Sequence, residues 1–124
     1  MSDDNSVANR LDSLFAAIDA KDTPGFLAYL TGDASFRFGS APAVKGHDAI
    51  GAAVDGFFET IKASKHSLSH VLGDGSTLVC EGDVTYTRHD GSEVTVPFTD
   101  IFELDGDLIA DYKIYMDISP LFAN

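Results

Sequence analysis

Asp100 is a residue whose type and position could carry chemistry. It lies in an alternating segment and shares one face with four apolar side chains: Val96, Phe98, Phe102 and Leu104. A carboxyl among apolar side chains is costly unless it is paired or protonated, and desolvation raises its pKa. A protonated Asp100 could donate a hydrogen bond or pass a proton to a ligand. The alternative, given equal weight, is a structural Asp satisfied by a neighbouring His or Arg.

His66 and His70 are the next candidates. They stand four residues apart in a segment with strand character, which places them on one face together with Leu68. Four residues of strand cover roughly 13 Å, so one metal ion could not bind both, and we predict no metal site. A neutral His in a cavity is a general acid or base, whereas its plainer role is a core His bonded to a carbonyl. We assign catalysis to His66 and place His70 near the cavity rim.

The predicted catalytic set is completed by two assisting residues, Asp19 and Tyr86. Asp19 stands beside the apolar stripe of the first helix, where an ordinary helix-end carboxylate is the simpler explanation. Apolar, aromatic and phenolic residues on inward faces suit a flat ligand with few polar groups to orient it. The predicted ligand contacts are Tyr29, Phe36, Phe38, Phe57, Phe58, His70, Phe98, Tyr112, Ile114 and Met116. We find no phosphate-binding loop and no nucleophile signature, and we predict no cofactor.

Charge and composition exclude several classes of partner. The chain has 124 residues and a formal net charge of −12, with only eight Lys and Arg scattered along it. Nucleic acids and anionic membranes both require a basic surface, so we expect neither as a partner. Cys80 is the single cysteine, and the segment 1–5 is acidic and polar, unlike a signal peptide. No window approaches 18 apolar residues, and we predict a cytoplasmic protein.

Helical periodicity marks the N-terminal half. Apolar residues at helical spacing predict a first helix over 7–20, a short second helix capped by Thr23 and closed by Gly32, and a third helix after 46–48. Between the last two, the segment 34–39 alternates as a strand does.

Period-two patterns mark the second half. They predict four strands at about 66–72, 77–88, 93–104 and 107–118. Turn signals separate these strands at Gly73-Asp74-Gly75, Asp90-Gly91 and Asp105-Gly106, since Asp-Gly supplies the positive φ of tight hairpins.

Helices followed by a meander predict one α+β domain over 1–124. Gly82 and Pro97 stand inside long strands, where such residues often mark bulges or corners. A bent, mixed or antiparallel sheet wrapped over three N-terminal helices makes a cone, a cystatin-like roll. Such a cone keeps a pocket near its open end, and we expect a small-molecule ligand there.

Four strings carry a family resemblance over nearly the whole chain, from about 7 to 122. They are Ile18-Asp19-Ala20-Lys21-Asp22, Gly46-His47-Asp48-Ala49-Ile50, Asp100-Ile101-Phe102-Glu103-Leu104-Asp105-Gly106 and Ile114-Tyr115-Met116-Asp117, the last followed by Pro120-Leu121. Together with the element order, they resemble the nuclear transport factor 2-like superfamily, and most of all its SnoaL-like, polyketide-cyclase-like bacterial members. The superfamily includes ketosteroid isomerases, scytalone dehydratases, limonene-epoxide hydrolases and proteins that only bind or dimerise.

The resemblance implies a role for each of three residues, but for one of them the partner residue is missing. Asp100 is similar to the oxyanion-hole Asp of ketosteroid isomerases, and His66 is similar to the catalytic His that follows the third helix in scytalone dehydratases. Asp19 is similar to the Asp that orients a second His in those dehydratases, but about Arg88 or Thr87 stands at that second position here.

Three positions depart from the related enzymes. Phe38 replaces the general-base Asp of the isomerases, and Leu14 replaces their oxyanion-hole Tyr. Ile114 replaces an Asp of the epoxide hydrolases. Neither of those two mechanisms is therefore expected here.

Two function classes follow from the sequence. One is a cofactor-independent acid/base enzyme of isomerase, dehydratase or lyase type, acting on a small, mainly apolar or aromatic metabolite. The alternative is a non-catalytic binding or dimerisation module of the same fold. We also expect a homodimer through the outer sheet face, where we place the apolar residues Val79, Val94, Ile109 and Tyr115.

Overall fold

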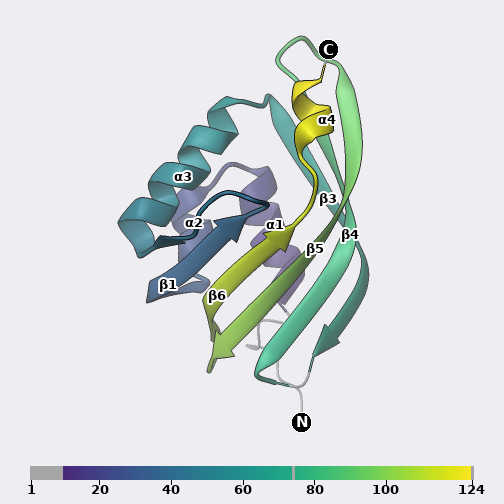
Figure 1. Ribbon diagram of the computed structural model, residues 1–124. Helices are drawn as coiled ribbons and strands as arrows, with labels where there is room; N and C mark the ends of the chain where they lie inside the picture. Colours follow the sequence, from purple (N-terminus) through teal and green to yellow (C-terminus); the bar gives the residue numbers. More distant parts are fainter. Residues whose placement is uncertain (1–9, 74, 124) are drawn as a thin grey trace.

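Six strands form one curved sheet, and helices lie against its concave face (Figure 1). The computed structural model describes residues 10–73 and 75–123. The helices are α1 (Leu11–Asp19), α2 (Thr23–Leu27), α3 (His47–Glu59) and α4 (Ser119–Phe122). The strands are β1 (Leu30–Phe38), β2 (Val44–Lys45), β3 (Ala63–Gly73), β4 (Thr77–Thr87), β5 (Glu93–Asp105) and β6 (Leu108–Tyr115).

The sheet combines an antiparallel meander with one parallel pair. Its strand order is β2-β1-β6-β5-β4-β3, so the chain crosses from β1 to the far edge and returns strand by strand. β1 runs parallel to β6, and this register pairs Phe36 with Tyr112 and Phe38 with Ile114. The predicted α+β class, with a curved mixed sheet over N-terminal helices, is confirmed.

Apolar stripes explain why the helices pack where they do. Leu14 and Phe15 of α1 and Ile50 and Phe58 of α3 are buried against the inner face of the sheet. Burial of such a stripe is the main stabilisation of an amphipathic helix, because short helices are marginal in water.

Some predicted boundaries were wrong. The second helix ends at Leu27, and Gly32 lies inside β1, between Leu30 and Ser35, the residues that pair with β6. The cap of α2 is Asp22, whose carboxylate accepts from Gly25 N (3.1 Å), and not Thr23. The predicted start of the first helix at residue 7 lies outside the described residues.

The first and the last of the four predicted strands also differ from the structure. β3 begins at Ala63, three residues early, and β6 ends at Tyr115. The unpredicted helix α4 follows, and Asp117 accepts from its first N–H, that of Ser119 (3.0 Å).

A bulge in β3 lies opposite Gly82 of β4, the interior glycine at which the sequence predicted a bulge or corner. The register of β3 on β4 shifts between Leu68 and His70, so Ser69 has no opposite residue. A Cβ added at Gly82 would lie 1.9 Å from Ser67 O, which explains why only glycine fits there. Pro97 lies in an unbroken register with β4, so no bulge against β4 marks that proline.

Gly82→Ala is expected to destabilise the fold by about 3 kcal/mol, because the backbone of β3 must move away from the new methyl group. Urea unfolding with both proteins at one concentration measures the change. Gly56→Ala is the matched control: nothing lies within 4 Å of its added Cβ in the middle of α3. There alanine should stabilise by about 0.5–1 kcal/mol. Equal stabilities for Gly82→Ala and the parent protein would contradict the crowding at the bulge.

Candidate functional site

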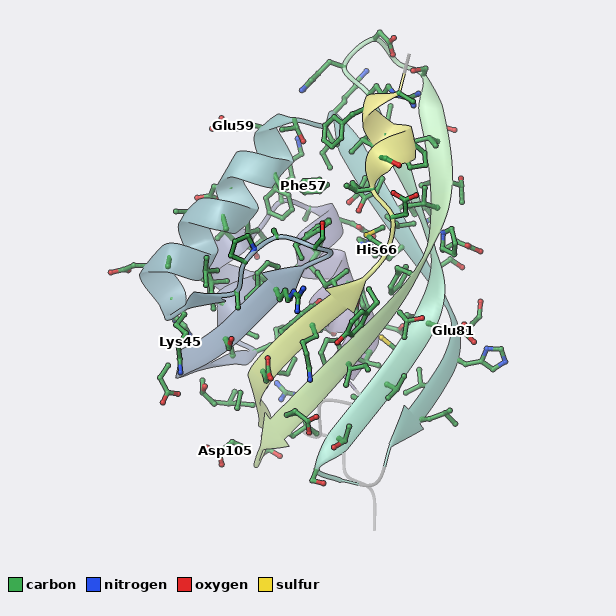
Figure 2. The ribbon with its side chains drawn as sticks, viewed as in Figure 1. Lys45, Phe57, Glu59, His66, Glu81 and Asp105 are labelled. Carbon is green, nitrogen blue, oxygen red and sulfur yellow. The ribbon has the colours of Figure 1, made fainter. Side chains whose placement is uncertain are left out.

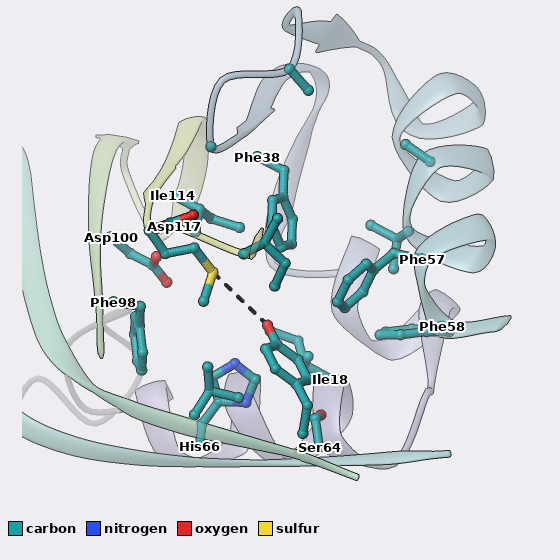
Figure 3. Close-up of a pocket in the computed structure, with 18 of the residues that line it drawn as sticks. Ile18, Phe38, Phe57, Phe58, Ser64, His66, Phe98, Asp100, Ile114 and Asp117 are labelled. Atoms are coloured by element: carbon teal, nitrogen blue, oxygen red, sulfur yellow. Dashed lines mark hydrogen bonds between the residues drawn. The ribbon is translucent and has the colours of Figure 1, made fainter. Parts of the chain in front are cut away.

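A cavity of about 790 Å³ lies between the helices and the concave face of the sheet (Figure 3). Its size is that of sites for drug-sized molecules. In Figure 3, Phe57 and Phe58 of α3 face Phe98 and Asp100 of β5 across the open space. Aromatic and aliphatic side chains make up most of the wall, and the polar groups are few.

Eight of the ten predicted ligand contacts line this cavity: Phe36, Phe38, Phe57, Phe58, Phe98, Tyr112, Ile114 and Met116. Tyr29 does not, and this part of the prediction was wrong. It precedes β1 on the far side of α2, where the Arg10 guanidinium lies 5.0 Å from its ring centroid. Whether the eight bind a ligand stays a prediction.

His70 was also misplaced. The bulge after Leu68 adds one residue to β3, and a shift of one residue sends the following side chains to the opposite face. His70 therefore lies exposed on the outer face, and its Nδ1 is 2.8 Å from Glu81 Oε1. In Figure 2, Glu81 points away from the sheet, whereas His66 lies between the sheet and the helices.

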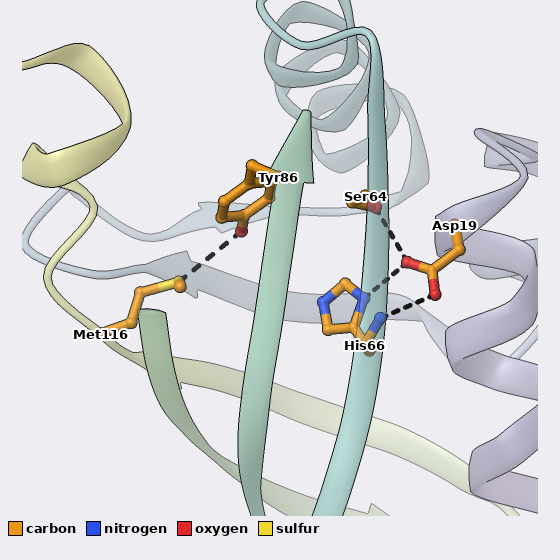
Figure 4. Close-up of polar contacts among 5 residues, drawn as sticks. All are labelled: Asp19, Ser64, His66, Tyr86 and Met116. Carbon is orange, nitrogen blue, oxygen red and sulfur yellow. Dashed lines mark hydrogen bonds and ion pairs between the residues drawn. The ribbon is translucent and has the colours of Figure 1, made fainter. Parts of the chain in front are cut away.

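His66 and Asp19 form a tight pair (Figure 4). Nδ1 of His66 is 2.6 Å from Oδ1 of Asp19, and the His66 backbone N–H donates to Oδ2 at 2.9 Å. Ser64 adds a third donor, its hydroxyl lying 2.8 Å from Oδ1. The end of α1 and the start of β3 are thereby joined through one carboxylate.

This pair orients the imidazole ring. Burial alone would raise the pKa of Asp19, but the hydrogen bonds and the charge of His66 outweigh burial, and the pKa is lowered. An ionised carboxylate only accepts, so His66 Nδ1 donates to it, and in the neutral form of this ring Nε2 would carry the lone pair. Figure 4 shows Nε2 turned away from Asp19, and His66 lines the cavity. A nitrogen in this position can act as a general base.

Asp100 supplies the second polar point of the cavity. Its side chain is buried, with 2% exposed, and its Oδ1 has no hydrogen-bond partner among the described residues. Burial raises the pKa of Asp100 well above its usual range, although a hydrogen bond with Tyr112 acts in the opposite direction. Tyr112 is itself buried, and burial followed by the Asp100 charge raises its pKa. Asp100 thus holds its proton more tightly than a solvent-exposed carboxyl does, and its Oδ1 is free to bond to a ligand.

His66 and Asp100 share the cavity without bonding to each other. The ring of Phe98 lies beside His66, with 5.4 Å between the ring centroids, and Phe98 stands two residues before Asp100 on one strand face. Asp19 bonds to His66, a partner that the sequence did not indicate. In Figure 3 the ring of Phe98 lies between the imidazole of His66 and the carboxyl of Asp100.

Tyr86 and Cys80 complete the buried polar groups near this wall. The Tyr86 hydroxyl donates weakly to Met116 Sδ (3.9 Å), and burial raises its pKa above its usual value. Burial, followed by the Asp100 charge, raises the pKa of Cys80 to about 12. Both groups are therefore neutral at physiological pH, and Cys80 packs in the core as predicted.

Sequence reasoning missed the residues that close the cavity mouth. Helix α4 contributes Ser119 and Phe122 to the wall, and Arg88 holds that helix by donating to Pro120 O (2.8 Å) and Leu121 O (2.9 Å). The Ser-Pro pair at 119–120 is a helix-start signal that could have revealed α4. Nothing in the sequence marks Ser64, whose role depends on the docking of α1.

The family follows from comparison with known domains. A family model described as the SnoaL-like domain matches residues 11–112. The chain belongs to the SnoaL-like domain family. The resemblance to the nuclear transport factor 2-like superfamily is therefore confirmed. No curated protein matches this SnoaL-like chain.

Solved structures extend the likeness of this SnoaL-like domain over nearly its full length. A nuclear transport factor 2-like protein of unknown function from Burkholderia pseudomallei has 19% identity and a TM-score of 0.84, over 98% of this chain and 96% of that one. A candidate SnoaL-like polyketide cyclase from a Jannaschia species has 19% identity and a TM-score of 0.80, over 93% and 88%. An epoxide hydrolase of the limonene-epoxide hydrolase type from Mycobacterium tuberculosis has 15% identity and a TM-score of 0.74, over 90% and 83%. At these identities the likeness shows the fold.

Residues 10–73 and 75–123 of this SnoaL-like domain contain neither a candidate metal-ligand cluster nor a candidate membrane span. No cluster of three or more His, Cys, Asp or Glu within them could hold a metal ion. No helix there is long and apolar enough to cross a membrane.

Proposed function

We propose that this SnoaL-like domain is a cofactor-independent acid/base enzyme, of isomerase, dehydratase or lyase type, acting on a small, mainly apolar or aromatic metabolite. The observation that carries the proposal is the Asp19–His66 pair, which leaves one ring nitrogen free in an apolar cavity. Membership of a family whose structural neighbours include an epoxide hydrolase supports small-molecule chemistry.

The steps use His66 and Asp100, which line the cavity, and Asp19, which bonds to His66 from outside it. Nε2 of His66 takes a proton from a C–H or O–H of the bound molecule, and Asp19 stabilises the resulting imidazolium at 2.6 Å. The electron pair left behind moves onto a neighbouring oxygen, to which protonated Asp100 donates. His66 then returns its proton to another atom of the substrate or to a departing hydroxyl. Tyr86 lies beside the same wall and helps to orient the ligand.

Solvent-deuterium exchange tests the proposal before the substrate is known. In D2O, enolisable aromatic and alicyclic ketones should exchange their α-protons faster with the protein than with buffer, and NMR measures the loss of the C–H signals. No exchange above buffer across such a panel would count against proton abstraction.

The second candidate, a binding module without catalysis, keeps some support. The isomerase general base and the hydrolase Asp are replaced by Phe38 and Ile114, which both line the cavity. Two results together would favour the binding module. Panel ketones would bind to the protein without deuterium exchange, and His66→Ala would change no turnover.

A homodimer through the outer sheet face remains a proposal, and its predicted residues need correction. Val94 and Ile109 pack against the core, because the inner face of β5 carries the even-numbered residues and a register shift turns Ile109 inward. Val79 and Tyr115 do lie on the outer face, with Leu72 beside Val79. This face carries charges of both signs, including Lys113 near Asp111 (3.9 Å), so two copies can meet despite their net charge of −12.

Sedimentation velocity at micromolar concentration is expected to show a dimer. Leu72→Glu should shift it to monomer, because the new charge would be buried in the apolar contact. Thr85→Glu, on the same face but away from Leu72, is the control and should remain dimeric. A monomeric parent protein would reject the interface.

A cytoplasmic location likewise stays a prediction.

A further inference from the structure

The charges around the cavity restrict what can enter it. Among the residues described as lining it, there is no Lys or Arg. His66 is the only lining side chain that can become a cation, and its charge would be matched by Asp19 at 2.6 Å. Proteins bind carboxylates and phosphates with Arg, Lys or free backbone N–H groups, because an unpaired anion loses its hydration without compensation. The cavity wall therefore offers an anion no counterion.

The groups near the cavity mouth that could have supplied a counterion already have hydrogen-bond partners. Arg88 is the basic residue that contacts α4, and its guanidinium donates to Pro120 O, Leu121 O and the Ser92 hydroxyl. The first N–H of α4, on Ser119, donates to Asp117. Asp117 itself lines the cavity, and its hydrogen bonds from Ser119 lower its pKa, so it is ionised at the mouth. Together with the net charge of −12, it repels an approaching anion.

The cavity interior is complementary to a flat, apolar molecule that carries an oxygen atom. Asp100 Oδ1 is buried and has no partner among the described groups, which costs free energy until a ligand atom bonds to it. The rings of Phe38 and Phe57 lie 5.0 Å apart on one side, and those of Phe15 and Phe98 lie 5.8 Å apart on the other. Aromatic walls of this kind stack well on planar rings.

We propose that the natural ligand is an uncharged, planar carbonyl compound, with one oxygen on Asp100 and the rest of its body between the aromatic walls. Carboxylates and phosphates that would have to enter the cavity are excluded. The choice of carbonyl rests on the proposed function, since the oxygen on Asp100 is where charge develops; the exclusion of anions rests on the cavity alone.

Two nearly isosteric ligands separate charge from shape. 2-Acetylnaphthalene is neutral and enolisable, whereas 2-naphthoate is an anion at about pH 7.5. Each is titrated against the protein loaded with the neutral dye N-phenyl-1-naphthylamine, and dye displacement gives an apparent Kd. We expect the ketone to bind at least about 10-fold more tightly than the carboxylate. Equal affinity, tighter naphthoate binding, or no displacement by the ketone up to its solubility limit would overturn the proposal.

A variant at the mouth tests the cause of the preference. Ala41 is exposed and lines the cavity, so Ala41→Arg adds a cation there without disturbing the core. It should tighten naphthoate binding about 5-fold or more and leave the ketone nearly unchanged, because the new guanidinium pairs only with the anion. Ala41→Gln, of similar length and no charge, should change neither. Equal effects of Arg and Gln on naphthoate would contradict the electrostatic explanation.

The outcome also separates this inference from the proposed function. Selective ketone binding without deuterium exchange keeps the ligand class and rejects catalysis by His66. Exchange found only for anionic ketones keeps the catalysis and rejects the ligand class. Asp100→Leu, which removes the oxygen-binding group, should weaken the ketone and leave naphthoate unaffected.

Discussion

His66→Ala is expected to lower kcat for solvent exchange by about 10²- to 10⁴-fold, the usual contribution of a general base. The reason is the position of Nε2, the ring nitrogen left free when Nδ1 donates to Asp19 at 2.6 Å. The measurement is the initial rate of deuterium incorporation into a panel ketone, followed by NMR at saturating ligand. Far-UV circular dichroism checks that the variant is folded.

Asp19→Asn should act through His66 and not through the ligand. Asp19 does not line the cavity, so KM should stay within about 2-fold of the parent value, whereas kcat should fall by about 10²-fold or more as the imidazolium loses its carboxylate. A merely structural Asp19 would instead change kcat and KM together or leave both unchanged. Ser64→Ala removes one of three donors to Asp19, and a smaller loss is expected.

His70→Ala is the matched control for these variants. It removes a histidine from the same strand, but His70 lies exposed on the outer face beside Glu81. Its exchange rate should equal that of the parent protein. A His66→Ala protein that retains the parent rate, or a His70→Ala protein that loses it, would reject the assignment of the base.

The contrast between these two histidines shows what the sequence can and cannot predict. Alternation along 66–72 identified a strand, and Asp-Gly signals located the turns, with Gly91 and Gly106 at positive φ. Alternation also predicts which side chains share a face, but only while the register is unbroken. The single unpaired residue, Ser69, reverses that prediction for His70. The bulge depends on the close approach of Ser67 O to Gly82, which is a contact between strands.

The partner of His66 was unpredictable for a related reason. Asp19 and His66 are 47 residues apart, and their contact depends on how the end of α1 docks against the edge strand β3. Local periodicity gives the apolar face of each helix and strand, but not the angle at which two of them meet. Inward-facing positions on single elements, such as Phe57, Phe98 and Asp100, were therefore predictable, whereas a hydrogen bond between two elements was not.

Asp100→Asn is expected to stabilise the protein at neutral and alkaline pH. The amide keeps the size of the carboxyl and can bond to Tyr112, but it cannot become a buried anion. Because burial raises the pKa of Asp100, the folded protein binds this proton more tightly than the unfolded chain does. The stabilisation that the proton gives is fully present below the unfolded pKa of about 3.9 and is lost as pH rises toward the folded value.

The pH dependence of stability tests this expectation. Unfolding in urea is measured from about pH 4 to pH 8 for both proteins, and the advantage of Asn over Asp should grow with pH. Each unit by which the folded pKa exceeds the unfolded one contributes about 1.4 kcal/mol, so a gain of at least that size is expected between the two ends. Asp83→Asn, at an exposed position of β4, should give parallel curves.

Tyr112→Phe separates burial from hydrogen bonding as the origin of this behaviour. The Tyr112 hydroxyl is the group that lowers the pKa of Asp100 against the effect of burial. Its removal should raise that pKa further, so the stability of Tyr112→Phe should keep falling beyond the pH at which the parent curve levels off. In the double variant with Asp100→Asn, this extended fall should disappear. A Tyr112→Phe curve that levels off at the same pH as the parent curve would contradict the effect assigned to the Tyr112 hydroxyl.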